Sequence, residues 1–269
     1  MSGVTPAIEA RGLRKRFSDL VAVDGVDLTV PAGSWFLFVG HNGAGKTTTI
    51  KMLAGLLPPS EGTVRIAGID PAKDPIGVRR AIGYLPERFE PYDYLTPREY
   101  LAFVADIHKI DRAVARERIE SLLELFDLDR HASKILRGFS QGMRKKVGLS
   151  AALVHDPAVL FLDEPTATLD PPTSHLIRRV LRRLCGQGKT VFMSTHILGL
   201  AERECDRVGV LHRGRISLEA SPDELAAQHP GKSLEEVVLE LTGGVEVQRI
   251  ERFFSRFPSG SSSSGSKPR

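Results

Sequence analysis

The chain has 269 residues, which is enough for one large domain or two small ones with a real hydrophobic core. Its 37 Lys and Arg stand against 33 Asp and Glu, and a net charge of +4 without a long basic block does not demand nucleic acid as a partner. The two cysteines, Cys185 and Cys205, lie outside any Cys-x-x-Cys pair, which argues against structural zinc or a disulfide framework and fits small buried residues in a reducing compartment.

The composition, with 41% hydrophobic residues, is that of a globular protein. No apolar run approaches the roughly 20 residues that cross a bilayer, and the N-terminus lacks the basic and then apolar layout of a secretory signal. We therefore expect a chain that stays in the cytoplasm and does not span a membrane.

The first elements in chain order are strands. Residues 8–17 and 21–30 alternate apolar and polar residues, which predicts an N-terminal antiparallel layer. The apolar run 35–39 predicts a buried strand, and residues 48–54 predict a helix. The segment between that strand and that helix is the most informative part of the chain.

This segment reads Gly-His-Asn-Gly-Ala-Gly-Lys-Thr and fits the pattern G-x-x-x-x-G-K-[ST] at every required position. Glycines allow backbone N–H groups to close around phosphate oxygens, Lys46 would reach the β- and γ-phosphates, and Thr47 would ligate Mg²⁺. An ordinary glycine-rich turn is the alternative, but the strand before the loop and the helix after it disfavour that interpretation. The predicted nucleotide-binding residues of the loop are Gly40, His41, Asn42, Gly43, Ala44, Gly45, Lys46, Thr47 and Thr48.

The middle of the chain changes character. Residues 62–68 and 81–85 predict two further strands, and from Thr96 to Leu136 the pattern becomes helical. Thr96 to Glu99 form a capping box with Pro97 at the first helical position. We expect a helical insertion, about residues 88–140, within an α/β core. The apolar face of its helices is predicted to consist of Ile119, Leu122, Leu123, Leu125 and Phe126.

In the second half, helices and strands alternate, which predicts a parallel sheet with helices on both faces. A helix follows Ser140, and then come a strand at 159–162, a helix at about 173–185 and a strand at 190–193. Two further helices are predicted to start after Ser221 and Ser233, because each serine is followed three residues later by Glu, as in a capping box.

The apolar strand 159–162 runs into two carboxylates, Asp163 and Glu164. They would lie at the carboxyl edge of the sheet, beside the phosphate loop. Asp163 would then hold Mg²⁺, and Glu164 would accept the proton of the attacking water. A surface carboxylate pair at the end of a strand is the alternative.

Taken together, these motifs resemble those of the nucleotide-binding subunit of ATP-binding cassette (ABC) transporters, from Ile8 to about Gly244. Residues 162–166 are similar to the second nucleotide motif of the family, residues 139–143 to its signature sequence, and residues 194–196 to its switch. The resemblance implies a P-loop NTPase core of the α/β class, with a mostly parallel sheet, the N-terminal antiparallel layer and the helical insertion. It implies an ATP-binding domain over residues 1–230. The residue pattern itself predicts a C-terminal helical extension over 231–257, and the Ser- and Gly-rich composition predicts a flexible tail over 258–269.

The resemblance also implies roles for single residues. Ser140 and Gly142 would bind the γ-phosphate of ATP held by the opposite subunit, and His196 would contact the γ-phosphate. Phe17 would stack on adenine, and Asp170 matches the acidic residue of the interface loop. Each of these residue types, taken alone, is more often structural, and it is their order along the chain that favours the functional interpretation.

The chain departs from the common family pattern at Glu87, where many members carry Gln as a ligand of Mg²⁺ and water; a carboxylate can also coordinate Mg²⁺. The signature has Gln141 and Met143 where Gly and Gln are commonest, and the interface loop carries Thr168. These features resemble the branch that serves ABC-2-type export permeases.

The resemblance therefore implies an ATPase that uses ATP and Mg²⁺, pairs head to tail with a second copy and powers a separate membrane permease, through which it would lie on the inner face of the plasma membrane. Coupling is expected mainly through residues 87–94. A soluble ABC ATPase acting on ribosomes or DNA is the alternative, disfavoured because such proteins carry tandem cassettes or long insertions. A regulatory GTPase is disfavoured because the only Asn is Asn42, so an Asn-Lys-x-Asp motif is absent.

Residues 245–257 place apolar residues on one side of a possible helix and arginines elsewhere. Such a helix can lie on an anionic membrane surface or pack against this domain or its partner. The sequence leaves both possibilities open.

Overall fold

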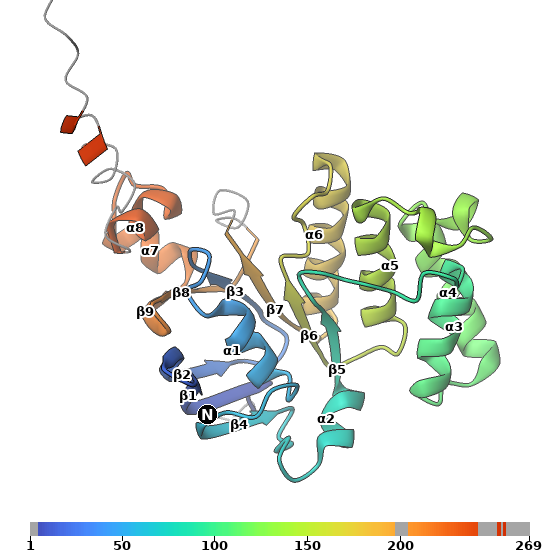
Figure 1. Ribbon diagram of the computed structural model, residues 1–269, viewed down its shortest axis with the longest axis horizontal. Coiled ribbons are helices and arrows are strands. Elements are labelled where there is room, and N and C mark those ends of the chain that lie inside the picture. Colours follow the sequence, from blue (N-terminus) through green and yellow to red (C-terminus); the bar gives the residue numbers. More distant parts are fainter. Residues whose placement is uncertain (1–4, 197–203, 242–251, 254, 257–269) are drawn as a thin grey trace, which may run out of the picture.

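The computed structural model describes residues 5–196, 204–241, 252–253 and 255–256. Two β-sheets form the body of this part of the chain, with helices packed on them and a helical region at one side (Figure 1). The smaller sheet is antiparallel, in the order β2-β1-β4, and it confirms the predicted N-terminal layer. Its strands are β1 (Ile8–Phe17), β2 (Leu20–Val30) and β4 (Glu61–Ile66).

The larger sheet has the order β5-β6-β7-β3-β8-β9, and the neighbouring strands from β5 to β8 are parallel. Strands β3, β6 and β7 are buried along their whole length, as expected for a sheet covered on both faces. The last strand, β9, is antiparallel to β8 and was not predicted from the sequence, nor was β8. The strands are β3 (Trp35–Val39), β5 (Ile82–Leu85), β6 (Val159–Asp163), β7 (Thr190–Thr195), β8 (Arg207–His212) and β9 (Arg215–Ala220).

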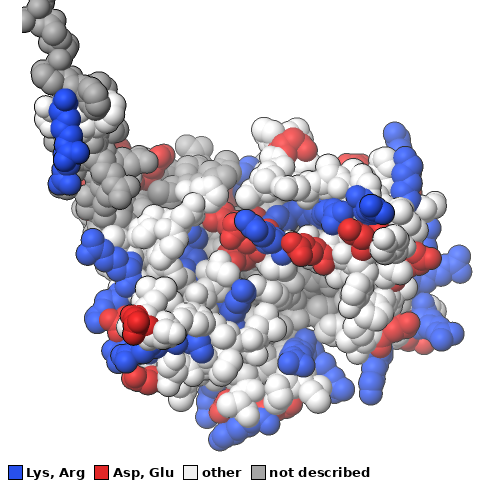
Figure 2. Space-filling view, viewed as in Figure 1, with Lys and Arg blue, Asp and Glu red and all other residues white. Residues whose placement is uncertain are grey.

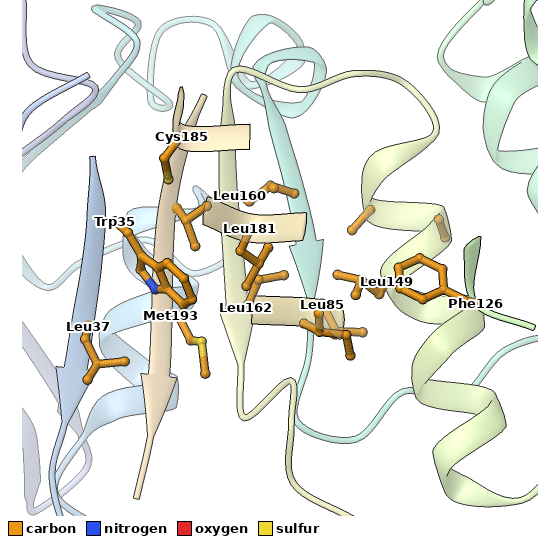
Figure 3. Close-up of a cluster of buried hydrophobic side chains, with 14 of the residues drawn as sticks. Trp35, Leu37, Leu85, Phe126, Leu149, Leu160, Leu162, Leu181, Cys185 and Met193 are labelled. Atoms are coloured by element: carbon orange, nitrogen blue, oxygen red, sulfur yellow. The ribbon is translucent and has the colours of Figure 1, made fainter. Parts of the chain in front are cut away.

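Two hydrophobic cores lie on the two faces of this sheet, because successive residues of a strand point to opposite sides. Phe36 and Phe38 of β3 face the antiparallel sheet and α1 (Lys46–Leu53). Trp35 and Leu37 face the other core, which includes side chains of α5 (Gln141–Leu153) and α6 (Pro171–Gly186), as Figure 3 shows. The phosphate loop therefore joins a strand and a helix that are both held in a packed core.

The helical insertion contains α3 (Pro97–Ile107) and α4 (Arg112–Leu125), and the shorter α2 (Pro75–Ala81) precedes it. The predicted capping box is confirmed, because the Glu99 amide donates to Thr96 Oγ1 at 3.2 Å while Glu99 Oε2 accepts from the Thr96 amide at 2.8 Å. One prediction was wrong: Leu125 is 37% exposed. Two positions correspond to about 200° of rotation, so Leu125 points away from the face that carries the buried Leu123.

The capped helix starts at Ser221 and Ser233 are confirmed, and they open α7 (Pro222–Gln228) and α8 (Leu234–Leu241). The predicted Ser/Gly tail, and residues 245–257 apart from 252–253 and 255–256, lie outside the described residues. In the part of the chain that is described, no helix has the length and apolar character that a bilayer crossing requires.

Candidate active site

The loop between β3 and α1 has glycine where its backbone has no room for a side chain. A Cβ on Gly40 would overlap the carbonyl oxygen of Leu211, and a Cβ on Gly45 would overlap that of Ala22. Gly45 also has a φ of 106°, and Gly43 has a φ of 81°, in the left-handed region that favours glycine. The loop is thus pressed against β2 and β8, with the N-terminus of α1 facing it, an arrangement that suits an anion.

Lys46 curls back over this loop. Its Nζ donates to the carbonyl oxygens of Gly40 at 2.6 Å and His41 at 3.3 Å, and the residue is only 7% exposed. Burial lowers the pKa of Lys46, and the carboxylates of Glu164, Asp163 and Glu87 oppose this shift. Within the described ranges the ammonium is held by carbonyl dipoles and by no direct ion pair, so phosphate oxygens can become its counter-charge.

Asp163 is fixed at the end of β6 by two hydroxyl groups. Thr47 Oγ1 donates to its Oδ2 at 2.7 Å, and Ser194 Oγ of β7 donates to its Oδ1. Asp163 is 1% exposed. Ser194 was noted in the sequence only as part of the switch motif, since its contact with Asp163 depends on the pairing of β6 with β7.

Glu164 follows β6 directly and has a φ of 50°, a strained conformation for a residue other than glycine. Its amide donates to both the carbonyl and the hydroxyl oxygen of Ser194 at 3.2 Å. Its Oε1 lies 2.9 Å from Nδ1 of His196, whose side chain is half exposed. Its Oε2 is buried and has no hydrogen-bond partner within the described ranges, so one carboxylate oxygen is available as a proton acceptor.

These groups line an open pocket of about 730 Å³. Phe17 is one of them, 45% exposed, with the Lys15 ammonium 5.3 Å from the centre of its ring. In the space-filling view of Figure 2, acidic and basic side chains lie close together across the upper middle of this face. The predicted site residues that line the pocket are Phe17, Asn42, Gly43, Gly45, Lys46, Thr47, Thr48, Glu87, Asp163, Glu164 and His196.

Six predicted residues do not line this pocket: Gly40, His41 and Ala44, which belong to the phosphate loop itself, and Ser140, Gly142 and Asp170, which cap or approach helices. Ser140 caps α5 by accepting from the Met143 amide at 3.3 Å, and Asp170 caps α6 by accepting from the Thr173 amide at 2.8 Å, which lowers the pKa of its carboxyl. Gly142 lies against the loop before Asp170, since a Cβ there would meet Leu169 Cδ2 at 3.4 Å. A single chain does not bring Ser140, Gly142 and Asp170 to its own phosphate loop.

Sequence reasoning missed Lys145, which is 6% exposed on α5. Its Nζ donates to the carbonyl oxygens of Glu87 at 2.6 Å and Pro86 at 3.4 Å. Burial lowers its pKa, opposed by Asp163, Glu87 and Glu164. Lys145 therefore connects the helix that starts at Ser140 to the segment that carries Glu87. The run Arg144-Lys145-Lys146 was the only signal in the sequence.

The donor atoms of the pocket fit Mg²⁺, which prefers oxygen ligands. The hydroxyl of Thr47 and the carboxylate of Asp163 are already in contact, and the carboxylate of Glu87 belongs to the same pocket. No group of three His, Cys, Asp or Glu residues that could hold a metal is found among the described residues. A cation here would therefore take only a few protein ligands and depend on phosphate oxygens for the rest.

Comparison with known proteins agrees with this geometry. The family model described as "ABC transporter" matches residues 23–167. The daunorubicin resistance ATP-binding protein DrrA3 of Streptomyces coeruleorubidus is 38% identical over 234 residues, which cover 87% of this chain and 74% of that protein. The Nod factor export ATP-binding protein I of Ralstonia nicotianae is 37% identical over 239 residues, which cover 87% of this chain and 73% of that protein.

Among solved structures, the dimeric, post-hydrolysis state of the ATP-binding cassette MJ0796 bound to ADP and Pi is similar, with a TM-score of 0.75 and 25% identity. The match covers 80% of this chain and 98% of that one. The fold described above is thus similar to that of a solved ATP-binding cassette.

Proposed function

Because this chain belongs to the ABC transporter family, as an ATP-binding subunit that hydrolyses ATP, we propose that the pocket around Lys46 performs the hydrolysis and that the motor serves an export permease. One observation carries the assignment of the reaction: Glu164 directs one carboxylate oxygen to His196 and keeps the other buried, with no hydrogen-bond partner among the described residues. A buried, unpaired carboxylate oxygen beside a phosphate-binding loop is suited to general-base catalysis.

The Lys46 ammonium and the N-terminus of α1 bind the β- and γ-phosphates. Glu164 accepts a proton from a water molecule as that water attacks the γ-phosphorus; the bond from phosphorus to the bridging oxygen breaks, and ADP and phosphate result. His196 holds Glu164 and contacts the γ-phosphate. Such a general base typically contributes a factor of ~10² to 10⁴ in rate.

Thr47, Asp163 and Glu87 would hold Mg²⁺, which supplies positive charge against the phosphate oxygens when bound. The support for this assignment is the oxygen-only donor set, in which Thr47 already contacts Asp163. Ser194 keeps the carboxylate of Asp163 in its orientation. Because Glu87 stands where many members of the family have Gln, the proposed Mg²⁺ site carries one more negative charge.

Two copies pair head to tail around two ATP molecules. The Ser140 segment of one copy contacts the γ-phosphate bound by the other, which accounts for Ser140 and Gly142 lying outside their own pocket. The dimeric state of the similar MJ0796 structure supports this arrangement. ATP joins the two copies, and hydrolysis lets them separate, which moves the permease between two conformations.

The permease is of the ABC-2 type and works as an exporter, and the chain lies on the cytoplasmic face of the plasma membrane through it. The names of the two relatives, one for daunorubicin resistance and one for Nod factor export, support export. The docking face is the segment from Glu87 to Tyr94 together with α3. Tyr92 and Tyr94 are 62% and 76% exposed there, and the Tyr92 ring lies edge-on to Phe103 at 5.6 Å.

Co-purification tests this proposal. The full chain is expressed with and without the multi-span membrane protein encoded beside it, and it should enter the membrane fraction only when that protein is present. A Tyr92→Ala/Tyr94→Ala double variant should lose this association and keep its ATPase activity in solution. Association with ribosomes or DNA at the same level, with or without the membrane protein, would refute the permease assignment.

A further inference from the structure

The turn between β8 and β9 has an arginine in a position that the turn itself does not favour. The pairing of His212 with Arg215 leaves two residues in the loop, Arg213 and Gly214, with φ values of 49° and 77°. Two positive φ values in a two-residue hairpin loop define a turn that favours Asn, Asp or Gly at the first position. The shape of the turn therefore does not explain why an arginine stands there.

This turn is fixed to the wall of the nucleotide pocket. The Gly214 amide donates to the carbonyl oxygen of Ala44 in the phosphate loop at 2.9 Å, and the Asp24 amide of β2 donates to the Gly214 carbonyl oxygen at 2.8 Å. A Cβ on Gly214 would lie 2.9 Å from the carbonyl oxygen of Ala22. In addition, Arg215 Nε donates to the Asp24 carboxylate at 3.0 Å. Arg213 is thus carried by a backbone whose position relative to the phosphate loop is set by direct contacts.

The turn lies against both the phosphate loop and β2, because Gly214 contacts Ala44 and Ala22. Arg213 and Gly214 line the pocket together with Phe17 and Lys46. The phosphate loop and β2 touch at this point, since a Cβ on Gly45 would overlap the Ala22 carbonyl oxygen. A nucleotide with its base at Phe17 and its terminal phosphates at Lys46 would have its ribose and α-phosphate at this level.

Arg213 is exposed, and its guanidinium forms no hydrogen bond or ion pair within the described part of the chain. The pKa of His212 is lowered mainly by burial. The positive charge of Arg213 and the His41 ring lower it further. The His41 and His212 rings lie edge-on at 5.4 Å, which links this end of β8 to the phosphate loop. A cation that has no partner among the described residues therefore stands on the wall of an anion-binding pocket.

We propose that Arg213 is a further nucleotide-binding residue, whose guanidinium pairs with the α-phosphate of ATP and of ADP. The inference rests on the proposed function of the pocket. Guanidinium groups match phosphate oxygens with charge-assisted hydrogen bonds. The α-phosphate is not cleaved, so the contact stabilises bound substrate and transition state alike and contributes to affinity for either nucleotide.

The variant Arg213→Asn separates the proposed effect of Arg213 on nucleotide binding from its effect on the stability of the turn. Asn suits a positive φ better than Arg, so Arg213→Asn should keep or raise the melting temperature while it removes the charge. Arg213→Lys keeps a charge, and Arg65→Asn removes an exposed arginine of β4 that does not line the pocket. The full-length variants are compared by titration with ATP and with ADP, by thermal unfolding and by steady-state ATPase assays.

We expect Arg213→Asn to raise the Kd of ATP and of ADP by the same factor, about 10-fold, with a matching rise in KM. Arg213→Lys should lose less affinity, and Arg65→Asn should bind as the parent does. Unchanged affinity in Arg213→Asn would overturn the inference, and so would a loss for ATP without one for ADP, which would move the contact to the γ-phosphate. If the parent chain bound neither nucleotide, the proposed function itself would fail, and this inference with it.

Discussion

The Nδ1 atom of His196 lies 2.9 Å from Oε1 of Glu164, across the carboxyl edges of the neighbouring strands β7 and β6. In the tautomer that carries a proton on Nδ1, the imidazole donates to the carboxylate and keeps it in one orientation. The other carboxylate oxygen then stays free for water. The His196–Glu164 pair therefore holds a general base in place beside the phosphate loop.

Replacing His196 should impair turnover much more than binding. His196→Ala removes a donor to Glu164 and the contact with the γ-phosphate, and we expect kcat to fall by about 10²- to 10³-fold with little change in the Kd of ATP. The side chain is half exposed, so the fold should not suffer. His175→Ala, an exposed histidine of α6 outside the pocket, is the control. Equal kcat values for the two variants would remove His196 from the reaction.

Replacing Phe17 should weaken ATP binding without weakening the fold. Phe17→Ala removes the surface on which adenine would stack, and the Kd of ATP should rise by about 3- to 10-fold, while Phe17→Trp should restore affinity. Leu56→Ala is a matched control, because Leu56 has the same exposure of 45% and does not line the pocket. A similar Kd for the Phe17→Ala and Leu56→Ala variants would contradict adenine stacking.

Replacing Lys145 should change the response to Mg²⁺. In Lys145→Met the Glu87 segment loses its donor, and the Mg²⁺ concentration for half-maximal ATPase activity should rise by about 10-fold or more, as for other residues that orient metal ligands. Lys145→Arg keeps donors and should rescue part of the loss. Lys73→Met, at an exposed lysine outside the pocket, should leave the Mg²⁺ response as it is. Equal Mg²⁺ concentrations for half-maximal activity in Lys145→Met and Lys73→Met would show that Lys145 does not orient the Glu87 segment for Mg²⁺ binding.

The free energy of unfolding should decrease at acidic pH because of His108, whose ring stacks on that of His155 with 3.7 Å between the ring centres. Burial, followed by the charges of His155 and Arg80, lowers the pKa of His108 to about 4. Between about pH 6.5 and pH 4, the unfolded chain therefore binds a proton at His108 that the folded chain does not bind. The contribution of the neutral His108 to the free energy of unfolding is complete above about pH 6.5 and is lost as the pH falls toward about 4.

His108→Phe keeps a ring in the stack and cannot take up the proton. The difference in melting temperature between pH 7.5 and pH 5 should be smaller in this variant than in the parent, and His175→Phe should leave that difference as it is. Parallel pH profiles for the parent and His108→Phe would show that the stacked pair does not titrate on unfolding.

Much of the fold follows from local rules that the sequence displays. The apolar run of β3, the capping boxes at Thr96 and Ser221, and the glycines of the phosphate loop each depend on neighbours within a few residues. β8 and β9 escaped prediction because their hairpin turn carries Arg-Gly and not the usual Asn-Gly. Leu125 was wrongly assigned to the buried face of α4, because an apolar residue can continue the apolar pattern of a helix without lying on the face that is buried.

The site was predictable where one segment supplies both the backbone and the chemistry, as at Lys46 and Thr47. Lys145 and Ser194 could not be recognised as site residues, because their contacts with Glu87 and Asp163 join segments that are 58 and 31 residues apart. Within one chain, Ser140 caps α5. A contact with the nucleotide of a second chain cannot be seen in the pocket of the first, which Ser140 does not line.

The most direct test of the account is the oligomeric state and turnover of Glu164→Gln with ATP and Mg²⁺, measured together by analytical ultracentrifugation and phosphate release. Glutamine keeps the shape of the side chain and cannot accept the proton, so hydrolysis should fall by about 10²- to 10⁴-fold while ATP accumulates in a stable dimer. Phosphate release at the parental rate, or a variant that binds ATP and remains monomeric, would contradict the claim that ATP joins two copies and that Glu164 starts its cleavage.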